Sequence, residues 1–285
     1  MSYWTELQEV EFCQRWIDCA GVRTRVVEAG RGARSILLLH GVQGHLEVWL
    51  HNLAALSRQY RVVAIDMLGH GLTARPDRPY EIKDYIEHAL CVLDALQINS
   101  ATWMGSSLGG WVSARAAARF PERVDKLVLV STAGLTADPA VMAKLKSLSE
   151  RAASMPGTEG VRERLKFVIH DPASVTDELV QSRWQIYSRP DFRNALKHIN
   201  ILQQMEIRER NLLTPVELSR IQAPTLVVWT DHDPTASLEQ GREYQRLIPG
   251  ARFVVIADCS HNPSLERPEE FNRVVLEFLG NTEKT

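Results

Sequence analysis

The most constraining feature of this chain is the stretch Thr102–Trp111, in which an apolar strand leads through a Gly-x-Ser-x-Gly turn into a helix. A serine on such a turn takes a strained backbone conformation, and the residues beside it must be very small. Gly105 and Gly109 fill those positions, so the register puts Ser107, rather than Ser106, at the tip of the turn. The dipole of the following helix favours negative charge beside Ser107. The pattern predicts a nucleophilic serine; its structural alternative is a glycine-rich turn before a closely packed helix.

The segments around this turn alternate between continuous apolar runs and amphipathic helical stretches. Continuous apolar runs are typical of parallel strands that helices cover on both faces. Such runs span 35–40, 61–66, 126–130, 223–229 and 251–256, and helical patterns cover 49–58, 80–96, 108–120 and 268–279. Upstream, residues 15–18 and 22–28 alternate in polarity around Ala20-Gly21 and predict an antiparallel hairpin at a sheet edge. The chain is therefore expected to adopt an α/β fold with a mostly parallel, doubly wound sheet.

The strand–helix alternation stops after Gly134 and resumes only near Ala223. The intervening segment is helical in pattern, with helix starts at Asp138-Pro139, Asp171-Pro172 and Thr176. We therefore expect an α/β core formed by residues 1–134 and 222–285, with a helical lid inserted at residues 135–221.

Composition narrows the class of partner. A chain of 285 residues with 45% hydrophobic content can bury a large core. Its net charge of −2 and dispersed basic residues argue against nucleic acid or a membrane surface and favour a small-molecule substrate. The four cysteines lack metal-ligand spacing, and no apolar run is long enough to span a bilayer, so we expect free thiols in a cytoplasmic protein. No metal and no cofactor are expected, and a homodimer is left open.

Two later loops supply the partners that a serine nucleophile needs. Such a serine requires a base within about 3 Å and a buried carboxylate that fixes the tautomer of the base. His261 follows the run 251–256, and Asp233 follows the run 223–229. Asp231 is the rival acid, but the longer reach of Asp233 past the strand end suits a carboxylate that must turn toward the histidine. The predicted triad is Ser107, His261 and Asp233.

The oxyanion of an intermediate needs backbone N–H donors, and two are expected. One belongs to Val42, in the loop after the run 35–40, and the other to Leu108, directly after Ser107. His40 beside this loop is interpreted as a buried, hydrogen-bonded imidazole, and Asp66–Gly71 as an Asx-type turn that ends a strand. The remaining histidines outside the triad show no second feature that would make them catalytic.

These pieces together resemble the α/β-hydrolase superfamily over nearly the whole chain. The matching motifs are His40-Gly41, Asp66-x-x-Gly-x-Gly71, Gly105–Gly110, Asp233 and Cys259-Ser260-His261. Within that superfamily, segments 177–190 and 270–279 resemble the meta-cleavage-product hydrolases, which cleave a carbon–carbon bond in vinylogous 1,5-diketones formed when catechol-type rings are opened. The resemblance implies a serine hydrolase of aromatic catabolism.

The same resemblance implies a set of substrate-binding residues. Arg183, followed by Trp184, matches the lid arginine that lies against the dienoate end of the substrate in that family. Gln43 and Ser106 match positions at the polar end of the pocket. The chain departs from the family pattern by having Ser106 in place of asparagine, Val42, Gln43 and His45 in place of a glycine-rich run, His51 in place of asparagine, and Asn262-Pro263 where tryptophan follows the histidine.

The sequence is consistent with three functions. The first is a hydrolase that cleaves a carbon–carbon bond in a small oxo-acid such as an aromatic ring-fission product. The second is a carboxylesterase that uses the same triad in an acyl-enzyme cycle. The third is a non-catalytic ligand receptor on a hydrolase scaffold.

Overall fold

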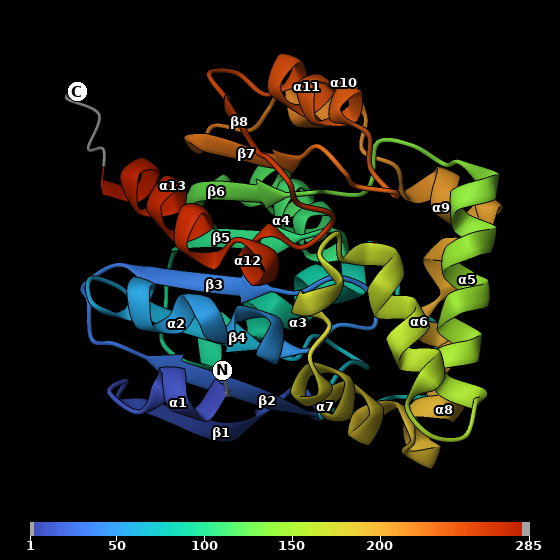
Figure 1. Ribbon diagram of the computed structural model, residues 1–285. Helices are drawn as coiled ribbons and strands as arrows, with labels where there is room; N and C mark the ends of the chain where they lie inside the picture. Colours follow the sequence, from blue (N-terminus) through green and yellow to red (C-terminus); the bar gives the residue numbers. More distant parts are fainter. Residues whose placement is uncertain (1–2, 281–285) are drawn as a thin grey trace.

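The computed structural model describes residues 3–280 and has an eight-stranded sheet at its centre (Figure 1). The strands are β1 (Phe12–Cys19), β2 (Val22–Ala29), β3 (Ser35–Leu39), β4 (Arg61–Ile65), β5 (Ala101–Ser106), β6 (Val124–Val130), β7 (Thr225–Thr230) and β8 (Arg252–Ile256). They are ordered β1-β2-β4-β3-β5-β6-β7-β8, and every neighbouring pair from β4 to β8 is parallel. The expected mostly parallel α/β sheet is confirmed.

The antiparallel hairpin is also confirmed, and it forms one edge of the sheet. β1 pairs with β2 from Phe12 opposite Ala29 to Cys19 opposite Val22, and β2 pairs antiparallel with β4. The two residues between the strands both have positive φ, 53° at Ala20 and 83° at Gly21. Such a two-residue turn matches the twist of the strands that it joins.

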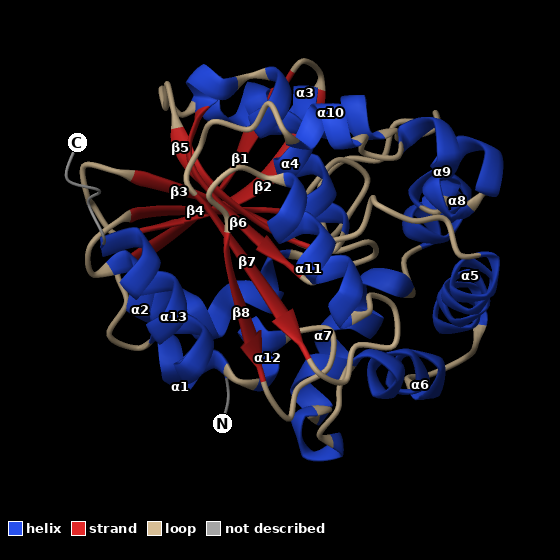
Figure 2. Ribbon diagram, turned by 90° about the horizontal axis from the view of Figure 1, so that it is seen from above, coloured by secondary structure: helices blue, strands red, loops and turns tan. Residues whose placement is uncertain are grey.

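Helices cover both faces of the sheet (Figure 2). On one side lie α1 (Tyr3–Leu7), α2 (Leu50–Ser57), α12 (Pro263–Glu266) and α13 (Pro268–Gly280), and on the other α3 (Ile82–Ala95), α4 (Leu108–Arg119) and α11 (Leu238–Leu247). Short 3₁₀ turns η1 (Leu46–Trp49) and η2 (Pro121–Arg123) lie in two connections. Leu37 and Leu39 of β3 belong to one hydrophobic cluster, whereas Ile36 and Leu38 belong to the other. Alternate side chains of a central strand therefore enter opposite cores, as a doubly wound sheet requires.

A helical segment joins β6 to β7. It contains α5 (Pro139–Ser154), α6 (Glu159–Val168), η3 (Pro172–Ser174), α7 (Asp177–Tyr187), α8 (Pro190–Ile199), η4 (Ile201–Gln203), α9 (Met205–Asn211) and α10 (Pro215–Leu218). Helices α5 to α9 lie at the carboxyl ends of the parallel strands (Figure 1), and α10 packs instead with α4 and α11. The division of the chain into core and lid stays a prediction. Helices α5 to α9 are called the lid.

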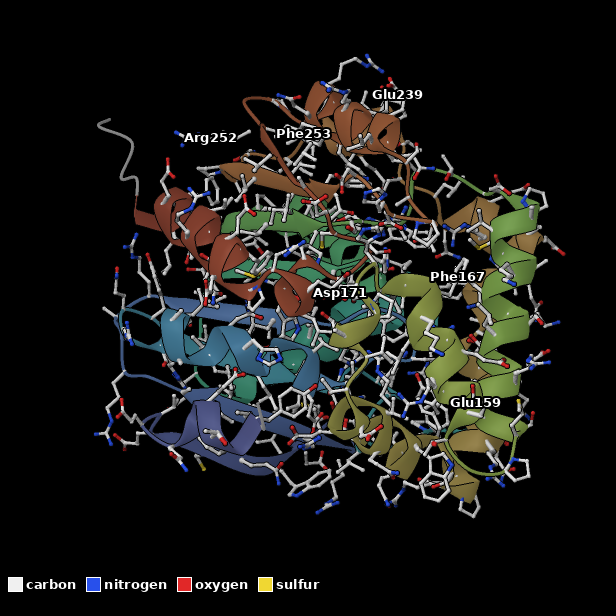
Figure 3. All side chains as sticks on the ribbon, viewed as in Figure 1. Glu159, Phe167, Asp171, Glu239, Arg252 and Phe253 are labelled. Atoms are coloured by element: carbon white, nitrogen blue, oxygen red, sulfur yellow. The ribbon has the colours of Figure 1, made fainter. Side chains whose placement is uncertain are left out.

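Local caps explain where two lid helices begin. The Asp138 carboxylate accepts the N–H groups of Ala140 and Val141, and the Thr176 hydroxyl accepts that of Leu179. The helix expected at Asp171-Pro172 is only the 3₁₀ turn η3, beside which Asp171 lies in Figure 3. Within residues 3–280, no helix combines the length and apolar character needed to cross a membrane.

Candidate active site

Ser107 lies at the junction of β5 and α4, with φ 54° and ψ −112°. This conformation is costly for a residue with a side chain and persists only where the surroundings impose it. The Ser107 N–H donates to the Val130 carbonyl at 2.9 Å, and the Ser107 carbonyl accepts the Ala133 N–H at 3.2 Å. A side-chain atom at Gly105 would lie 2.2 Å from the backbone of Gly109, and one at Gly109 would lie 2.2 Å from the backbone of β3. The strained turn therefore needs glycine at both positions.

Asp233 and His261 meet beside this turn. The Asp233 Oδ2 atom lies 2.6 Å from His261 Nδ1, and its Oδ1 atom accepts the Thr235 N–H and hydroxyl, both at 2.8 Å, and the Ala236 N–H at 3.1 Å. Burial by itself raises the pKa of Asp233, but the charge of His261 and the hydrogen bonds from His261 and Thr235 hold that pKa below its usual value. An ionised Asp233 fixes the orientation of the imidazole and leaves Nε2 for the cavity.

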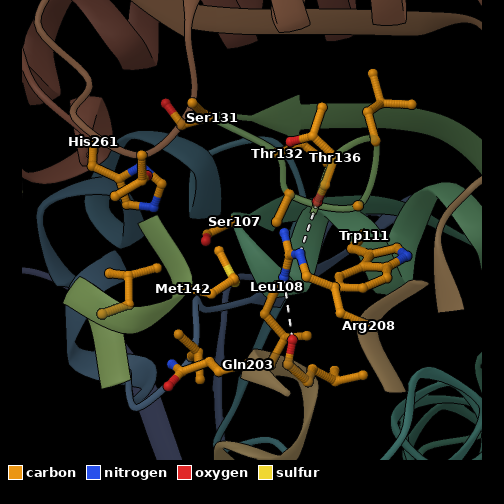
Figure 4. Close-up of a pocket in the computed structure, with 18 of the residues that line it drawn as sticks. Ser107, Leu108, Trp111, Ser131, Thr132, Thr136, Met142, Gln203, Arg208 and His261 are labelled. Carbon is orange, nitrogen blue, oxygen red and sulfur yellow. Dashed lines mark hydrogen bonds between the residues drawn. The ribbon is translucent and has the colours of Figure 1, made fainter. Parts of the chain in front are cut away.

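Ser107 and His261 line the same cavity (Figure 4). The atoms that the structure describes give no direct hydrogen bond between them. In unliganded sites such contacts are often long and tighten only when substrate is bound.

Asp231, the alternative acid, binds backbone N–H groups instead of the histidine. Asp231 accepts the N–H groups of Asp258 at 3.1 Å and Cys259 at 3.2 Å, so it fixes the loop that carries His261 without touching the imidazole. Asp231, His232 and Asp258 also form an exposed group whose potential metal-ligand atoms lie within 4.8 Å of one another. This group does not line the Ser107 cavities described here.

Val42 and Leu108 both line the cavity at Ser107. The Gly44 N–H donates to the Gly41 carbonyl at 2.9 Å and closes a turn around Val42 and Gln43. Leu108 is the first residue of α4, so its N–H has no acceptor within the helix. The two N–H groups are therefore candidates for holding an oxyanion beside Ser107.

Buried polar side chains support the turn that carries Val42. His40 Nε2 accepts the Met67 N–H at 3.0 Å, so its Nδ1 must carry the proton that is donated to the Gly41 carbonyl at 2.7 Å. Burial holds the pKa of His40 well below its usual value, so the ring is neutral. Asp66 accepts the N–H groups of Leu46 and Leu72, both at 2.8 Å. These contacts agree with the interpretation of His40 as a buried, hydrogen-bonded imidazole. The Asx-type turn expected at Asp66 is not what the structure has, because the Asp66 carboxylate binds Leu46 and Leu72 rather than the N–H two residues on.

The lid contributes two buried arginines to this site. Arg183 of α7 and Arg164 of α6 are 6% and 5% exposed, and both line a hollow of about 580 Å³ beside Ser107, here called the Arg183 cavity. Arg164 donates to the Ser149 hydroxyl at 2.9 Å and to the Val42 carbonyl at 3.4 Å. In both arginines Nε is buried without a partner, and no carboxylate among residues 3–280 forms an ion pair with either.

Such an arrangement is costly without a ligand. Burial lowers the pKa of Arg164 because the charged form loses its hydration. A guanidinium stays charged even when desolvated, so two of them facing one cavity favour an anion there.

A second hollow adjoins Ser107 on the other side. It spans about 660 Å³, part of which is open to solvent, and is called the Trp111 cavity (Figure 4). It shares with the Arg183 cavity the lining residues Val42, Ser107, Leu145, Thr235 and His261. Ser107 therefore lies where two compartments of different character meet.

The predicted substrate-binding residues divide into two groups. Ser106 and Arg183 line the Arg183 cavity, whereas Gln43 and Trp184 line neither hollow. The Gln43 amide donates to the Asn200 side chain at 2.8 Å, and the Gln43 carbonyl accepts the Tyr187 hydroxyl at 2.6 Å. Gln43 is thus a link between the turn and the lid. Trp184 is half-buried on another side of α7, because consecutive helical residues point about 100° apart.

Sequence reasoning missed Arg164 and Thr235. Arg164 interrupts the apolar stripe of α6, where the residues at helical spacing are Val161, Leu165 and Val168. A charged residue on a buried stripe is a usable signal for a site. Thr235 carried no comparable signal. Its hydrogen bond to Asp233 is a local contact within one loop, and its contact with His261 arises only when two loops distant in the sequence come together.

Comparison with known proteins agrees with this architecture. A family model described as alpha/beta hydrolase fold matches residues 34–268. The chain belongs to the α/β-hydrolase family. This hydrolase is 30% identical over 272 residues to 2-hydroxymuconate semialdehyde hydrolase of Pseudomonas putida, covering 94% of this chain and 95% of the relative.

Other relatives are of the same kind. Over 279 residues the chain is 28% identical to 2-hydroxy-6-oxo-6-(2'-aminophenyl)hexa-2,4-dienoic acid hydrolase of Metapseudomonas resinovorans, with 96% and 93% of the two chains covered. A crystal structure of the meta-cleavage product hydrolase CumD matches with a TM-score of 0.84 and 28% identity, covering 94% of this chain and 98% of that one. The resemblance to meta-cleavage-product hydrolases is confirmed, and the chain is an α/β-fold serine hydrolase.

Proposed function

We propose that this hydrolase cleaves a carbon–carbon bond in a small oxo-acid of the aromatic ring-fission type. The observation that carries the proposal is the pair of buried arginines, Arg183 and Arg164, that line the Arg183 cavity without a carboxylate partner. An anionic dienoate end would supply the missing charge. Relatives that act on hydroxy-oxo-dienoates and on 2-hydroxymuconate semialdehyde support the same substrate class.

The geometry of the site supports the following roles. The acyl arm is the part of the substrate that carries the second carbonyl group, across the breaking bond from the dienoate end. Ser107, or a water that His261 activates, adds to the carbonyl carbon of this arm, and His261 takes the proton released in that step. Asp233 keeps the imidazole in the required tautomer and stabilises its charged form. The N–H groups of Val42 and Leu108 hold the resulting oxyanion.

The lid arginine acts on the other half of the substrate. After the dienol has been converted to its keto form, breaking the carbon–carbon bond leaves an electron pair on the dienoate fragment as an enolate. Arg183 stabilises that developing charge, which an ester substrate would not generate at this position. Stabilisation that grows as the bond breaks raises kcat rather than merely tightening substrate binding.

The test is turnover by the purified protein of a coloured ring-fission product and of a neutral aryl ester. We expect efficient loss of the ring-fission colour and slower ester hydrolysis. Fast ester hydrolysis with no ring-fission activity would establish the carboxylesterase alternative instead. Tight binding of a ring-fission product without turnover of either substrate would favour the receptor.

Further expectations accompany this function. The four cysteines are free thiols in the structure, which suits the expected cytoplasmic location. A small-molecule substrate without a cofactor, and a homodimer as an open option, also remain expectations for this enzyme.

A further inference from the structure

The Trp111 cavity contains a charge that a purely apolar acyl arm would not use. Much of its lining is apolar, including Trp111, Met142, Ile199 and Leu202. Arg208 of α9 also lines it, and this side chain is only 7% exposed. Figure 4 shows Arg208 lying beside Trp111 within the cavity, on the side of Ser107 away from His261.

The contacts of Arg208 leave its charge uncompensated. Its Nε donates to the Thr136 carbonyl at 2.8 Å and its Nη1 to the Leu202 carbonyl at 3.4 Å, and the guanidinium carbon lies 5.1 Å from the centre of the Trp111 ring. No carboxylate in the described part of the chain forms an ion pair with it. Burial lowers the pKa of Arg208 to about 10, so the group remains positive at neutral pH.

A second unpartnered group lies in the same cavity. Gln203 is 9% exposed, and both the oxygen and the nitrogen of its amide are buried without a hydrogen-bond partner. Buried polar atoms in native proteins are almost always paired. Gln203 and Arg208 line the Trp111 cavity and not the Arg183 cavity, whereas Arg164 and Arg183 line only the latter.

We infer that Arg208 forms a second carboxylate subsite, in a cavity that also offers the unpaired Gln203 amide to a polar substrate, and that the substrate is a ring-fission product with a carboxylate at each end. The inference rests on the proposed function and deepens it. One carboxylate lies at Arg183 and Arg164, the acyl arm extends past Ser107 into the Trp111 cavity, and its terminal carboxylate accepts hydrogen bonds from the Arg208 guanidinium.

The chemistry balances with water as the only co-reactant. The hydroxyl group of water bonds to the carbonyl carbon of the acyl arm as the adjacent carbon–carbon bond breaks. The electron pair of that bond and the proton from water pass to the dienoate fragment. The acyl arm therefore leaves as a short dicarboxylic acid, with one carboxyl group newly formed and the other held at Arg208.

Arg208 also has a structural alternative, since it bridges Thr136 and Leu202 on the two sides of the lid. That role would affect all substrates equally, whereas a carboxylate subsite affects only a charged acyl arm. The matched control is Arg210, which lies on the same helix but is half-exposed and paired with Glu81 at 2.5 Å.

The experiment compares two ring-fission products with the same dienoate end, one with an acyl arm ending in methyl and one with an arm ending in carboxylate. We expect the wild-type protein to prefer the carboxylate-armed substrate by about tenfold or more in kcat/KM. Arg208→Gln should raise KM for that substrate by roughly tenfold or more and leave the methyl-armed substrate within about twofold. Arg210→Gln should change neither. A wild-type preference for the methyl arm, or equal losses on both substrates in Arg208→Gln, would overturn the subsite.

A binding measurement separates failure of the subsite from failure of the proposed function. Calorimetry with succinate and butyrate on the wild-type protein needs no turnover. Succinate is expected to bind at least about tenfold more tightly than butyrate, and Arg208→Gln should remove the difference. If esters alone are hydrolysed but this difference is found, the carbon–carbon reaction is wrong and the anion subsite remains. If ring-fission products are cleaved but succinate gains nothing over butyrate, the subsite is wrong and the reaction remains.

Discussion

The strand-end loops and the lid that covers them differ in how their buried charges are paired. In the loops, the buried Asp233 carboxylate pairs with His261 at 2.6 Å. In the lid, Arg164, Arg183 and Arg208 are buried, and no carboxylate among the described residues pairs with them. The loop groups are therefore organised before substrate arrives, whereas the lid arginines are left for an anion of the substrate to complete.

The largest expected effect comes from the turn at the centre of the organised region. Ser107→Ala should lower kcat by about a million-fold if Ser107 is the nucleophile, because the loss of that atom removes the step that the rest of the site supports. Steady-state kinetics on the ring-fission product measures it.

The adjacent serine is the control for this prediction. Ser106 lines the Arg183 cavity but lies within β5, so Ser106→Ala should retain most activity. A large loss in Ser106→Ala with little loss in Ser107→Ala would show that the register is wrong.

The next effect concerns the choice of acid. Asp233→Asn should lower kcat by roughly a thousandfold or more, because a neutral amide neither fixes the same tautomer nor stabilises the imidazolium. Asp231→Asn should cost far less, since that carboxylate binds only backbone N–H groups of the His261 loop and a weaker acceptor can partly replace it. Parallel kinetics of the two variants decide between the acids, and a reversed order would make Asp231 the partner of the histidine.

The lid arginine should give a smaller but more selective effect. Arg183→Ala should lower kcat on a ring-fission product by about a hundredfold, because a charge-assisted contact that strengthens during bond breaking is lost. Hydrolysis of a neutral aryl ester should change by no more than about twofold, since no enolate forms there. The ratio of the two losses is the quantity to measure.

A matched lid substitution tests whether the loss reflects general damage to the lid. Arg151→Ala removes a half-exposed arginine that is already paired with Glu163 at 2.8 Å. Surface ion pairs contribute little, so both activities should remain near wild type. Equal losses on both substrates in Arg183→Ala would remove the main argument for carbon–carbon cleavage.

The smallest predicted effect lies where the two regions touch. Tyr187→Phe removes only the hydroxyl that donates to the Gln43 carbonyl at 2.6 Å and ties the Val42 turn to the lid. One neutral hydrogen bond contributes about 1 kcal/mol, so kcat should fall by roughly fivefold while KM changes little. A change confined to KM would show that the hydroxyl positions substrate rather than the turn.

The sequence by itself determined the fold and the order of the chemistry along it. The Gly105–Gly109 turn, the apolar runs and the Ala20-Gly21 hairpin rest on steric limits and on side-chain periodicity, which are local properties. For the same reason the sequence predicted Ser107 at a strand-to-helix turn, and Asp233 and His261 after the last two strands.

Only the tertiary structure decided which groups face one another. It brought Asp233 rather than Asp231 to His261, turned Gln43 toward Asn200 and Trp184 away from the cavity, and placed Arg164 and Arg208 on opposite sides of Ser107. A lid side chain points into a cavity or away from it according to how its helix packs on the core. That packing depends on contacts between segments far apart in the chain, which local periodicity does not encode.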